Sequence, residues 1–87
     1  MRLARHPRTA GRVIDGRAMV VSIDQNRLFT LSPTATCIWE ALAEPRSTSE
    51  LAAGLCATFN VDQATALSDC SRFCDDLRER GLVVALP

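Results

Sequence analysis

Four cysteines and one histidine are the side chains of this 87-residue chain best suited to metal or nucleophile chemistry. The cysteines are Cys37, Cys56, Cys70 and Cys74, and no two of them form the C-x₂-C pair that zinc sites usually contain. Cys70 and Cys74 lie one helical turn apart, so two thiolates could face one ion. Free cysteine is also a small core hydrophobe, however, and each of the four falls near an apolar helix face. We therefore interpret them as core residues and predict no metal site.

His6 is the only histidine, and it stands beside Pro7 in a short basic segment. A Cys–His or Ser–His–Asp catalyst needs a base that a packed neighbour orients, and this segment offers none. The chain also lacks tyrosine, lysine and a glycine-rich phosphate loop. We predict no catalytic residue and no cofactor, and hence a protein that is not an enzyme.

The charges are distributed unevenly, although the formal net charge is zero. Residues 1–31 contain six arginines and two acids, whereas residues 32–87 contain four arginines and eight acids. This pattern is not the broad basic field of a nucleic-acid binder. The apolar runs are too short to span a membrane, and the N-terminus lacks the apolar segment of a secretory signal. We expect a cytoplasmic protein with reduced cysteines and without nucleic acid or membrane as a partner.

The first half of the chain has the pattern of a small antiparallel sheet. A hairpin is predicted over residues 13–23 around Asp15-Gly16, because glycine readily adopts the positive φ that tight hairpin turns require. A third strand is predicted at residues 27–31. Only a helical layer could bury the apolar face of such a sheet. The alternating apolar residues that share one face of the second strand are Met19, Val21 and Ile23.

The second half has the pattern of three helices. Ser32-Pro33 supplies an N-cap and a proline at the first helical position, which predicts a helix over residues 33–43. A capping box at residues 47–50 begins the second helix, and Asp62 caps a third over residues 63–80. The predicted fold is α+β and winged-helix-like, with a three-stranded antiparallel sheet followed by three helices. We expect one domain over residues 11–87, preceded by a flexible basic arm at residues 1–10.

Two kinds of binding are compatible with this element order. A third strand at the sheet edge would present unpaired N–H and C=O groups, so a peptide could add as a further strand, with the third helix as the other wall of a groove. Sheet edges also occur without any ligand, so the residues alone leave this question open. A winged-helix order also raises DNA binding, or a purely scaffolding subunit. The third helix, however, carries four acids that phosphates would repel, namely Asp69, Asp75, Asp76 and Glu79.

Three groups of residues recur in a distinctive order between Val20 and Val84. They are Leu31-Ser32-Pro33-Thr34-Ala35 with Ile38-Trp39 and Leu42; Ser47-x-x-Glu50-Leu51-Ala52-x-x-Leu55 with Phe59; and Phe73-x-x-x-Leu77-x-x-x-Gly81-Leu82-Val83. In these residues the chain resembles the PqqD family, whose members recognise precursor peptides of ribosomally made, modified peptides. It departs from the family at Ser32, where asparagine or aspartate is usual, and at residues 44–46, which replace an Asp-Gly-type turn. Its hairpin and residues 38–40 are closer to the stand-alone relatives of lasso-peptide clusters than to the pyrroloquinoline quinone pathway.

The resemblance implies a non-catalytic peptide chaperone. Such a protein binds the leader of a precursor peptide by strand addition and presents it to a modifying enzyme, such as a radical S-adenosylmethionine protein or a leader peptidase. The implied peptide-binding residues are Arg27, Leu28, Phe29, Thr30 and Leu31 of the third strand, with Leu67, Ser71, Cys74 and Arg78 of the third helix. An edge strand also makes a homodimer possible.

Overall fold

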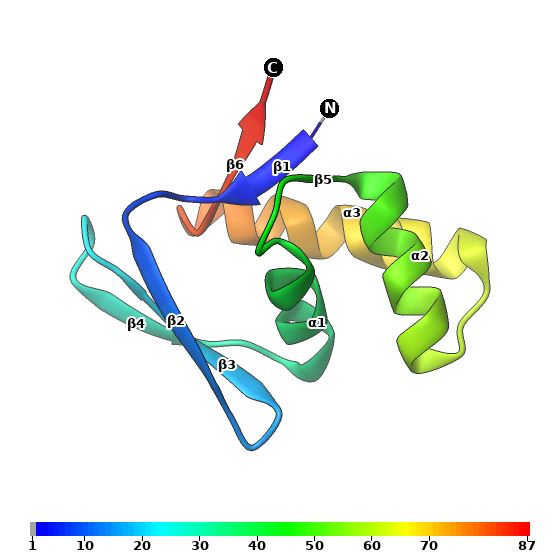
Figure 1. Ribbon diagram of the computed structural model, residues 1–87, viewed down its shortest axis with the longest axis horizontal. Helices are drawn as coiled ribbons and strands as arrows, with labels where there is room; N and C mark the ends of the chain where they lie inside the picture. Colours follow the sequence, from blue (N-terminus) through cyan, green and yellow to red (C-terminus); the bar gives the residue numbers. More distant parts are fainter. Residues whose placement is uncertain (1) are drawn as a thin grey trace.

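Two small antiparallel sheets and three helices make up residues 2–87, the part of the chain that the computed structural model describes (Figure 1). Sheet A has the strand order β5-β1-β6, and sheet B has the order β2-β3-β4. The strands are β1 (Arg2–Arg5), β2 (Thr9–Ile14), β3 (Arg17–Ser22), β4 (Arg27–Thr30), β5 (Arg46–Ser47) and β6 (Val83–Leu86). The helices are α1 (Pro33–Ala41), α2 (Thr48–Phe59) and α3 (Gln63–Glu79). This architecture confirms the predicted α+β class.

Sheet B is the three-stranded sheet that the sequence predicts. Asp15 and Gly16 have φ angles of 53° and 76°, so both central residues of the β2–β3 turn adopt the left-handed conformation of a type I′ hairpin. In the turn between β3 and β4, Asn26 adopts a φ of 52°. The register places Val20 of β3 opposite Phe29 of β4. Both side chains are buried, and α1 lies against β3 on that side.

The buried face of β3 is the opposite of the one that the apolar alternation suggests. Val20 is fully buried, whereas Val21 is 39% exposed and Ile23 is 51% exposed. Phe29 and Leu31 come just before α1, and both side chains are buried against it. Because Val20 lies opposite Phe29, the face of β3 that carries Val20 is buried as well. A shift of one residue in the pairing exchanges the two faces of a strand. The pairing of Val20 with Phe29 therefore decides which face of β3 is buried.

Side-chain caps fix the beginnings of the helices, as predicted. The Ser32 hydroxyl accepts a hydrogen bond from the first turn of α1. Ser47 and Glu50 form the reciprocal capping box of α2, with bonds of 3.0 and 3.2 Å. Asp62 accepts the Thr65 N–H at 2.8 Å, and hydrogen bonding with the Thr65 side chain and with this N–H holds the pKa of the Asp62 carboxyl below its ordinary value.

The helix ends also follow the sequence. Asn60 adopts a φ of 53° after α2, as a left-handed residue at a helix C-terminus does. Gly81 adopts a φ of 74° after α3, and the Leu82 N–H donates to the Leu77 carbonyl at 2.9 Å in a Schellman arrangement. The chain thereby turns from α3 into β6.

Residues 2–10 contain two strand segments, which differs from the flexible arm that the sequence predicts for residues 1–10. β1 pairs antiparallel with β6, from Arg2 opposite Leu86 to Arg5 opposite Val83, and also pairs with β5. The two ends of the chain therefore lie side by side (Figure 1). Leu3 is 1% exposed and belongs to the core, which explains why the segment is ordered. Met1 of the predicted arm lies outside the described residues.

The core joins both sheets through α1, which lies between sheet B and α2 (Figure 1). Trp39 of α1 is 3% exposed. The Arg5 guanidinium donates two hydrogen bonds to the Trp39 carbonyl and lies 4.5 Å from the centre of its ring. Partial burial lowers the pKa of Arg5, and the pairing with the ring tethers β1 to α1.

The cysteines pack as core residues. Cys70 and Cys74 are buried with their sulfur atoms 3.8 Å apart, and Cys37 and Cys56 are half-buried. The hydrogen bond with Cys74, together with burial, raises the pKa of the Cys70 thiol. Within residues 2–87, no three histidine, cysteine or acidic side chains come together as a metal site. No helix in this part of the chain is long and apolar enough to cross a membrane.

Candidate functional site

The edge of β4 that points away from β3 has no strand partner within residues 2–87, and we call it the open edge. The Leu31 N–H donates to the Ala18 carbonyl of β3 at 2.8 Å. The N–H and C=O groups of successive residues point to opposite sides of a strand, so Phe29 bonds to β3 and the groups of Leu28 and Thr30 point outward. β4 therefore offers two donors and two acceptors, spaced as in a strand ladder, to an incoming chain.

α3 runs past this open edge in the direction opposite to β4. Near the start of β4, the Arg80 guanidinium lies 5.7 Å from the centre of the Phe29 ring. The Gln25 side chain donates to the Arg80 carbonyl at 2.6 Å, which fixes the β3–β4 turn to the end of α3. Beyond the end of β4, Thr34 of α1 and Asp69 of α3 line one pocket. β4 and α3 are thus held together near the start of the strand, and a pocket lies between α1 and α3 beyond its end.

The flank of α3 that faces β4 carries an aromatic ring between two ion pairs. Its residues follow the helical spacing i, i+4, i+7 and i+11 and are Asp69, Phe73, Asp76 and Arg80. Asp69 pairs with Arg72 at 3.1 Å, and Asp76 pairs with Arg80 at 3.1 Å. Phe73 is half-buried against the core, with the Arg72 guanidinium 5.6 Å from its ring centre. The charges of this flank are thus largely matched within it, and the ring offers an apolar contact.

A small pocket lies where β4 leads into α1. It has a volume of about 250 Å³, enough for one large side chain. Phe59 is 39% exposed and provides an aromatic wall. The residues that line it are Thr34, Leu55, Phe59, Val61, Ala66 and Asp69. Most of them are apolar, so the pocket suits an apolar anchor of a bound peptide.

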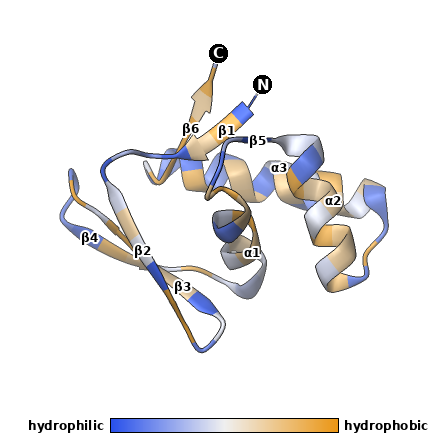
Figure 2. Cartoon of the chain, viewed as in Figure 1, coloured by the Kyte–Doolittle hydropathy of each residue, from blue (hydrophilic) through white to orange (hydrophobic). Residues whose placement is uncertain are grey.

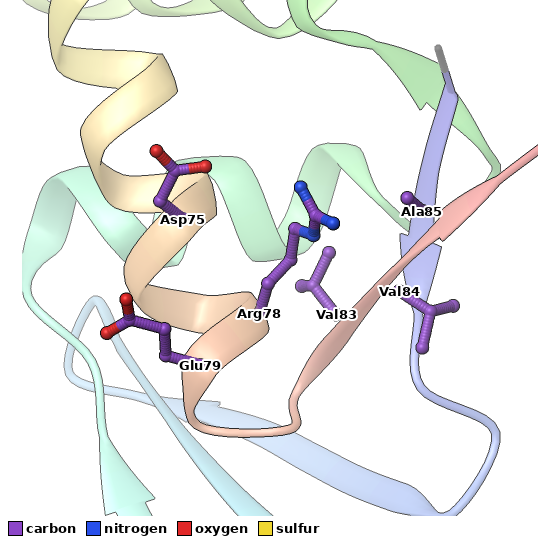
Figure 3. Close-up of a pocket in the computed structure, with 6 residues that line it drawn as sticks. All are labelled: Asp75, Arg78, Glu79, Val83, Val84 and Ala85. Atoms are coloured by element: carbon purple, nitrogen blue, oxygen red, sulfur yellow. The ribbon is translucent and has the colours of Figure 1, made fainter.

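The structure places the predicted strand residues at the open edge but the predicted helix residues elsewhere. Arg27, Leu28, Phe29 and Thr30 form β4, and Leu31 follows it. Leu67, Ser71, Cys74 and Arg78 share the other flank of α3. Arg78 lines a surface with residues 83–85 of β6 (Figure 3), Cys74 is 3% exposed, and Leu67 is 42% exposed to solvent.

The side chains that lie beside the open edge of β4 were not named from the sequence, and they are Phe73, Asp76, Arg80 and Phe59. Helical periodicity predicts which residues share a flank, but it does not say which flank lies beside a given strand. The contact between Arg80 and Phe29 decides this, and it joins residues far apart in the sequence. The only local signal was Gly81, which fixes the end of α3 and so the position of Arg80 next to the β3–β4 turn.

β6 has a second open edge beside that other flank. The His6 N–H donates to the Leu82 carbonyl at 2.9 Å, so within β6 the backbone groups of Val83 and Ala85 point away from β1. The depression between β6 and α3 measures about 580 Å³ and is lined by Asp75, Arg78 and Glu79 with residues 83–85 (Figure 3). This side presents charged side chains and small aliphatic ones but no aromatic ring.

The fold and the open edge of β4 define a small winged-helix-like α+β domain with a strand edge available for pairing. The sequence model of the family described as coenzyme PQQ synthesis protein D (PqqD) matches residues 17–83, and this chain belongs to the PqqD family. The match runs from β3 to the start of β6, so it includes β4 and α3. It confirms the resemblance seen in the sequence.

Two solved structures share this fold. One is TbiB1 in complex with the TbiA(beta) leader peptide, with a TM-score of 0.87 at 21% identity, covering 97% of this chain and 98% of that chain. The other is a lasso peptide synthetase B1 complexed with the leader peptide, with a TM-score of 0.81 at 19% identity, covering 95% and 98% of the two chains. No curated protein sequence matches this chain at a significant level.

Proposed function

We propose that this protein is a non-catalytic peptide chaperone that binds the leader of a ribosomally made precursor peptide by strand addition to β4. The observation that carries the proposal is the open edge of β4, where the backbone groups of Leu28 and Thr30 point outward beside α3. Membership of the PqqD family supports it, as does the leader peptide that both similar structures contain.

The geometry suits a peptide that runs antiparallel to β4. Its N-terminal part would lie near the pocket that Phe59 and Asp69 line, and its C-terminal part near Gln25 and Arg80. Its inward side chains would contact Phe73, and one apolar side chain would fill the pocket. A few strand hydrogen bonds with such anchors are consistent with a micromolar Kd, which corresponds to about −8 kcal/mol.

The bound leader would be presented to a modifying enzyme, such as a radical S-adenosylmethionine protein or a leader peptidase. This chain then contributes recognition rather than chemistry and needs no cofactor of its own. Because ribosomally made precursors arise in the cytoplasm, we place the protein there.

Proline substitution at the two edges of sheet B tests strand addition. Thr30→Pro removes an outward N–H of β4 and should abolish binding of a fluorescently labelled leader, measured by anisotropy. The matched control is Val13→Pro at the open edge of β2. The Ile23 N–H donates to Arg8, so the Val13 N–H points away from β3 and its loss breaks no ladder bond. Both variants are checked by circular dichroism, and a folded Thr30→Pro protein with full leader affinity would rule out strand addition at β4.

A salt titration separates peptide binding from the DNA alternative. Affinity for a phosphate backbone falls steeply with salt, whereas strand addition with apolar anchors should change little. α3 presents Asp75, Asp76 and Glu79, which would repel phosphates. Tight, salt-sensitive binding of labelled duplex DNA would overturn the peptide assignment. A scaffolding subunit would instead bind the enzyme and show no affinity for the leader.

A further inference from the structure

Sheet B exposes a group of large apolar side chains on the side that faces away from the helices. We call this side the outer face. Ile14 is 49% exposed, Val21 39%, Ile23 51% and Leu28 57%. Met19 lies on the same face and is half-buried. Apolar residues thus run along sheet B as well as along the helices (Figure 2).

The outer face of β3 carries larger apolar side chains than the face that packs on the core. The inward residues of β3 are Ala18, Val20 and Ser22, whereas those facing outward are Arg17, Met19 and Val21. An antiparallel sheet with one solvated face normally has polar residues on that face. The exposed apolar side chains of Val21, Ile23 and Leu28 therefore indicate that a partner covers the outer face when the protein acts.

The apolar residues of the outer face form one continuous patch. Val21 of β3 lies opposite Leu28 of β4 on one side and Ala10 of β2 on the other. Directly opposed side chains on one face of a sheet are in contact distance. Ile23 extends the patch past the end of β3. Continuous exposed apolar patches on small proteins commonly mark interaction sites.

The charges around the patch favour a partner other than a second copy of this chain. Arg12 lies opposite Met19, and Arg17 opposite Ile14, so both arginines arise from the outer face. The acids nearest in sequence are Asp15 in the hairpin turn and Asp24, which pairs with Arg8. Two copies packed through this face would bring arginines together. The complementary surface is apolar at its centre and acidic at its rim.

We propose that the outer face of sheet B docks the modifying enzyme through an apolar surface with an acidic rim. This inference rests on the proposed function, since it names where the enzyme meets the peptide chaperone. Leu28 links the two sites, because its backbone groups belong to the open edge of β4 while its side chain lies on the outer face. An enzyme seated on the outer face is therefore next to the leader without occupying the strand edge that holds it.

Substitutions on the outer face test the proposal. The probes are the two enzyme classes named above, a purified leader peptidase and a purified radical S-adenosylmethionine protein, each titrated with the full-length protein by isothermal calorimetry. Val21→Glu should weaken enzyme binding at least tenfold, and Arg12→Glu should weaken it by reversing a rim charge. Leu67→Glu is the matched control, since Leu67 is 42% exposed but lies on α3, and it should leave enzyme binding unchanged. If Val21→Glu does not fold, Ile23→Glu makes the same change past the end of β3.

The leader affinity of each variant is measured in parallel. The backbone of Val21 bonds to β2 rather than to the edge of β4, so Val21→Glu should bind labelled leader as the wild type does. A wild type that binds no leader refutes the proposed function, whatever the enzyme does. A wild type that binds leader and binds the enzyme equally well before and after Val21→Glu refutes the docking surface.

Two further measurements exclude other occupants. Sedimentation equilibrium should find a monomer, and vesicles of equal parts phosphatidylglycerol and phosphatidylcholine should not retain the protein. A dimer that Val21→Glu dissociates, or vesicle binding that Val21→Glu abolishes, would overturn the enzyme as the occupant.

Discussion

α3 lies between two open strand edges, and its two flanks place different side chains beside them. The flank toward β4 carries Phe73 between two ion pairs and leads to a pocket of about 250 Å³ with Phe59 in its wall. The flank toward β6 borders a wider depression of about 580 Å³ lined by Asp75, Arg78 and Glu79. Both edges offer backbone groups, but only the β4 side adds aromatic anchors.

This difference shows why an open edge is not by itself a peptide-binding site. Backbone hydrogen bonds to a strand edge replace bonds to water, so each contributes only about 1 kcal/mol. The remaining affinity and the choice of sequence come from side chains that fit beside the strand. The β6 edge instead belongs to a sheet that closes the fold, because β6 pairs along its length with β1. We therefore expect changes on the β6 side to affect stability and changes on the β4 side to affect leader binding.

The largest expected effect is on stability, at Leu3 of β1. Leu3 is 1% exposed, and removing such a buried side chain commonly costs about 3 kcal/mol. Leu3→Ala should lower the free energy of unfolding by that amount and so lower the urea midpoint, whereas Ile14→Ala, at a residue 49% exposed, should change both little. Leader affinity should stay the same at temperatures where the variant is folded. An unchanged midpoint for Leu3→Ala would restore the view of residues 1–10 as a flexible arm.

The sequence predicted the parts of the fold that local chemistry determines. The Asp15-Gly16 turn, the capping box at residues 47–50 and the Gly81 helix end are each specified by a few neighbouring residues. Sheet A was missed because β1 pairs with β6 across the whole length of the chain, and no local pattern encodes such a partner. The buried face of β3 was also misjudged, because its outward side chains are the larger ones.

The next largest effect is expected in the pocket beside β4. Phe59 and Leu67 are similarly exposed, at 39% and 42%, but Phe59 lines the pocket beside β4, whereas Leu67 lies on the flank of α3 that carries Arg78. Phe59→Ala should weaken leader binding about tenfold, since it removes an apolar wall worth about 1–2 kcal/mol when covered. Leu67→Ala should not change the affinity. Anisotropy titrations measure the leader affinity of both variants. A larger loss of affinity in Leu67→Ala than in Phe59→Ala would place the peptide on the β6 side.

Of the residues predicted to bind the peptide, those of the strand lie on the open edge of β4, whereas those of the helix lie on the flank of α3 away from that edge. A short third strand leading into Ser32-Pro33 predicted β4 at the edge of a sheet, and the structure has it there. Helical spacing correctly predicted that the four helix residues share one flank of α3, and these residues are Leu67, Ser71, Cys74 and Arg78. Which flank faces β4 depends on how α3 packs across the core, and that is a property of the whole fold.

Arg80 and Arg78 give the finest test of the two flanks, because they are the same residue type two positions apart on α3. The Arg80 guanidinium covers the Phe29 ring at 5.7 Å, while Arg78 lines the surface beside β6. This contact orders the edge of β4 before the leader binds, and cation–π contacts at partly exposed sites contribute about 0.5–1 kcal/mol. Arg80→Ala should therefore weaken leader binding two- to fivefold, because the leader must then order that edge itself.

Arg78→Ala should leave leader binding unchanged. Both variants lose one positive charge from the same helix, so a general electrostatic effect would shift both affinities equally and would weaken at high salt. A loss confined to Arg80→Ala and insensitive to salt assigns the effect to the contact with Phe29. A loss confined to Arg78→Ala would mean that the leader lies against β6, and the helix residues first predicted from the sequence would then be the right ones.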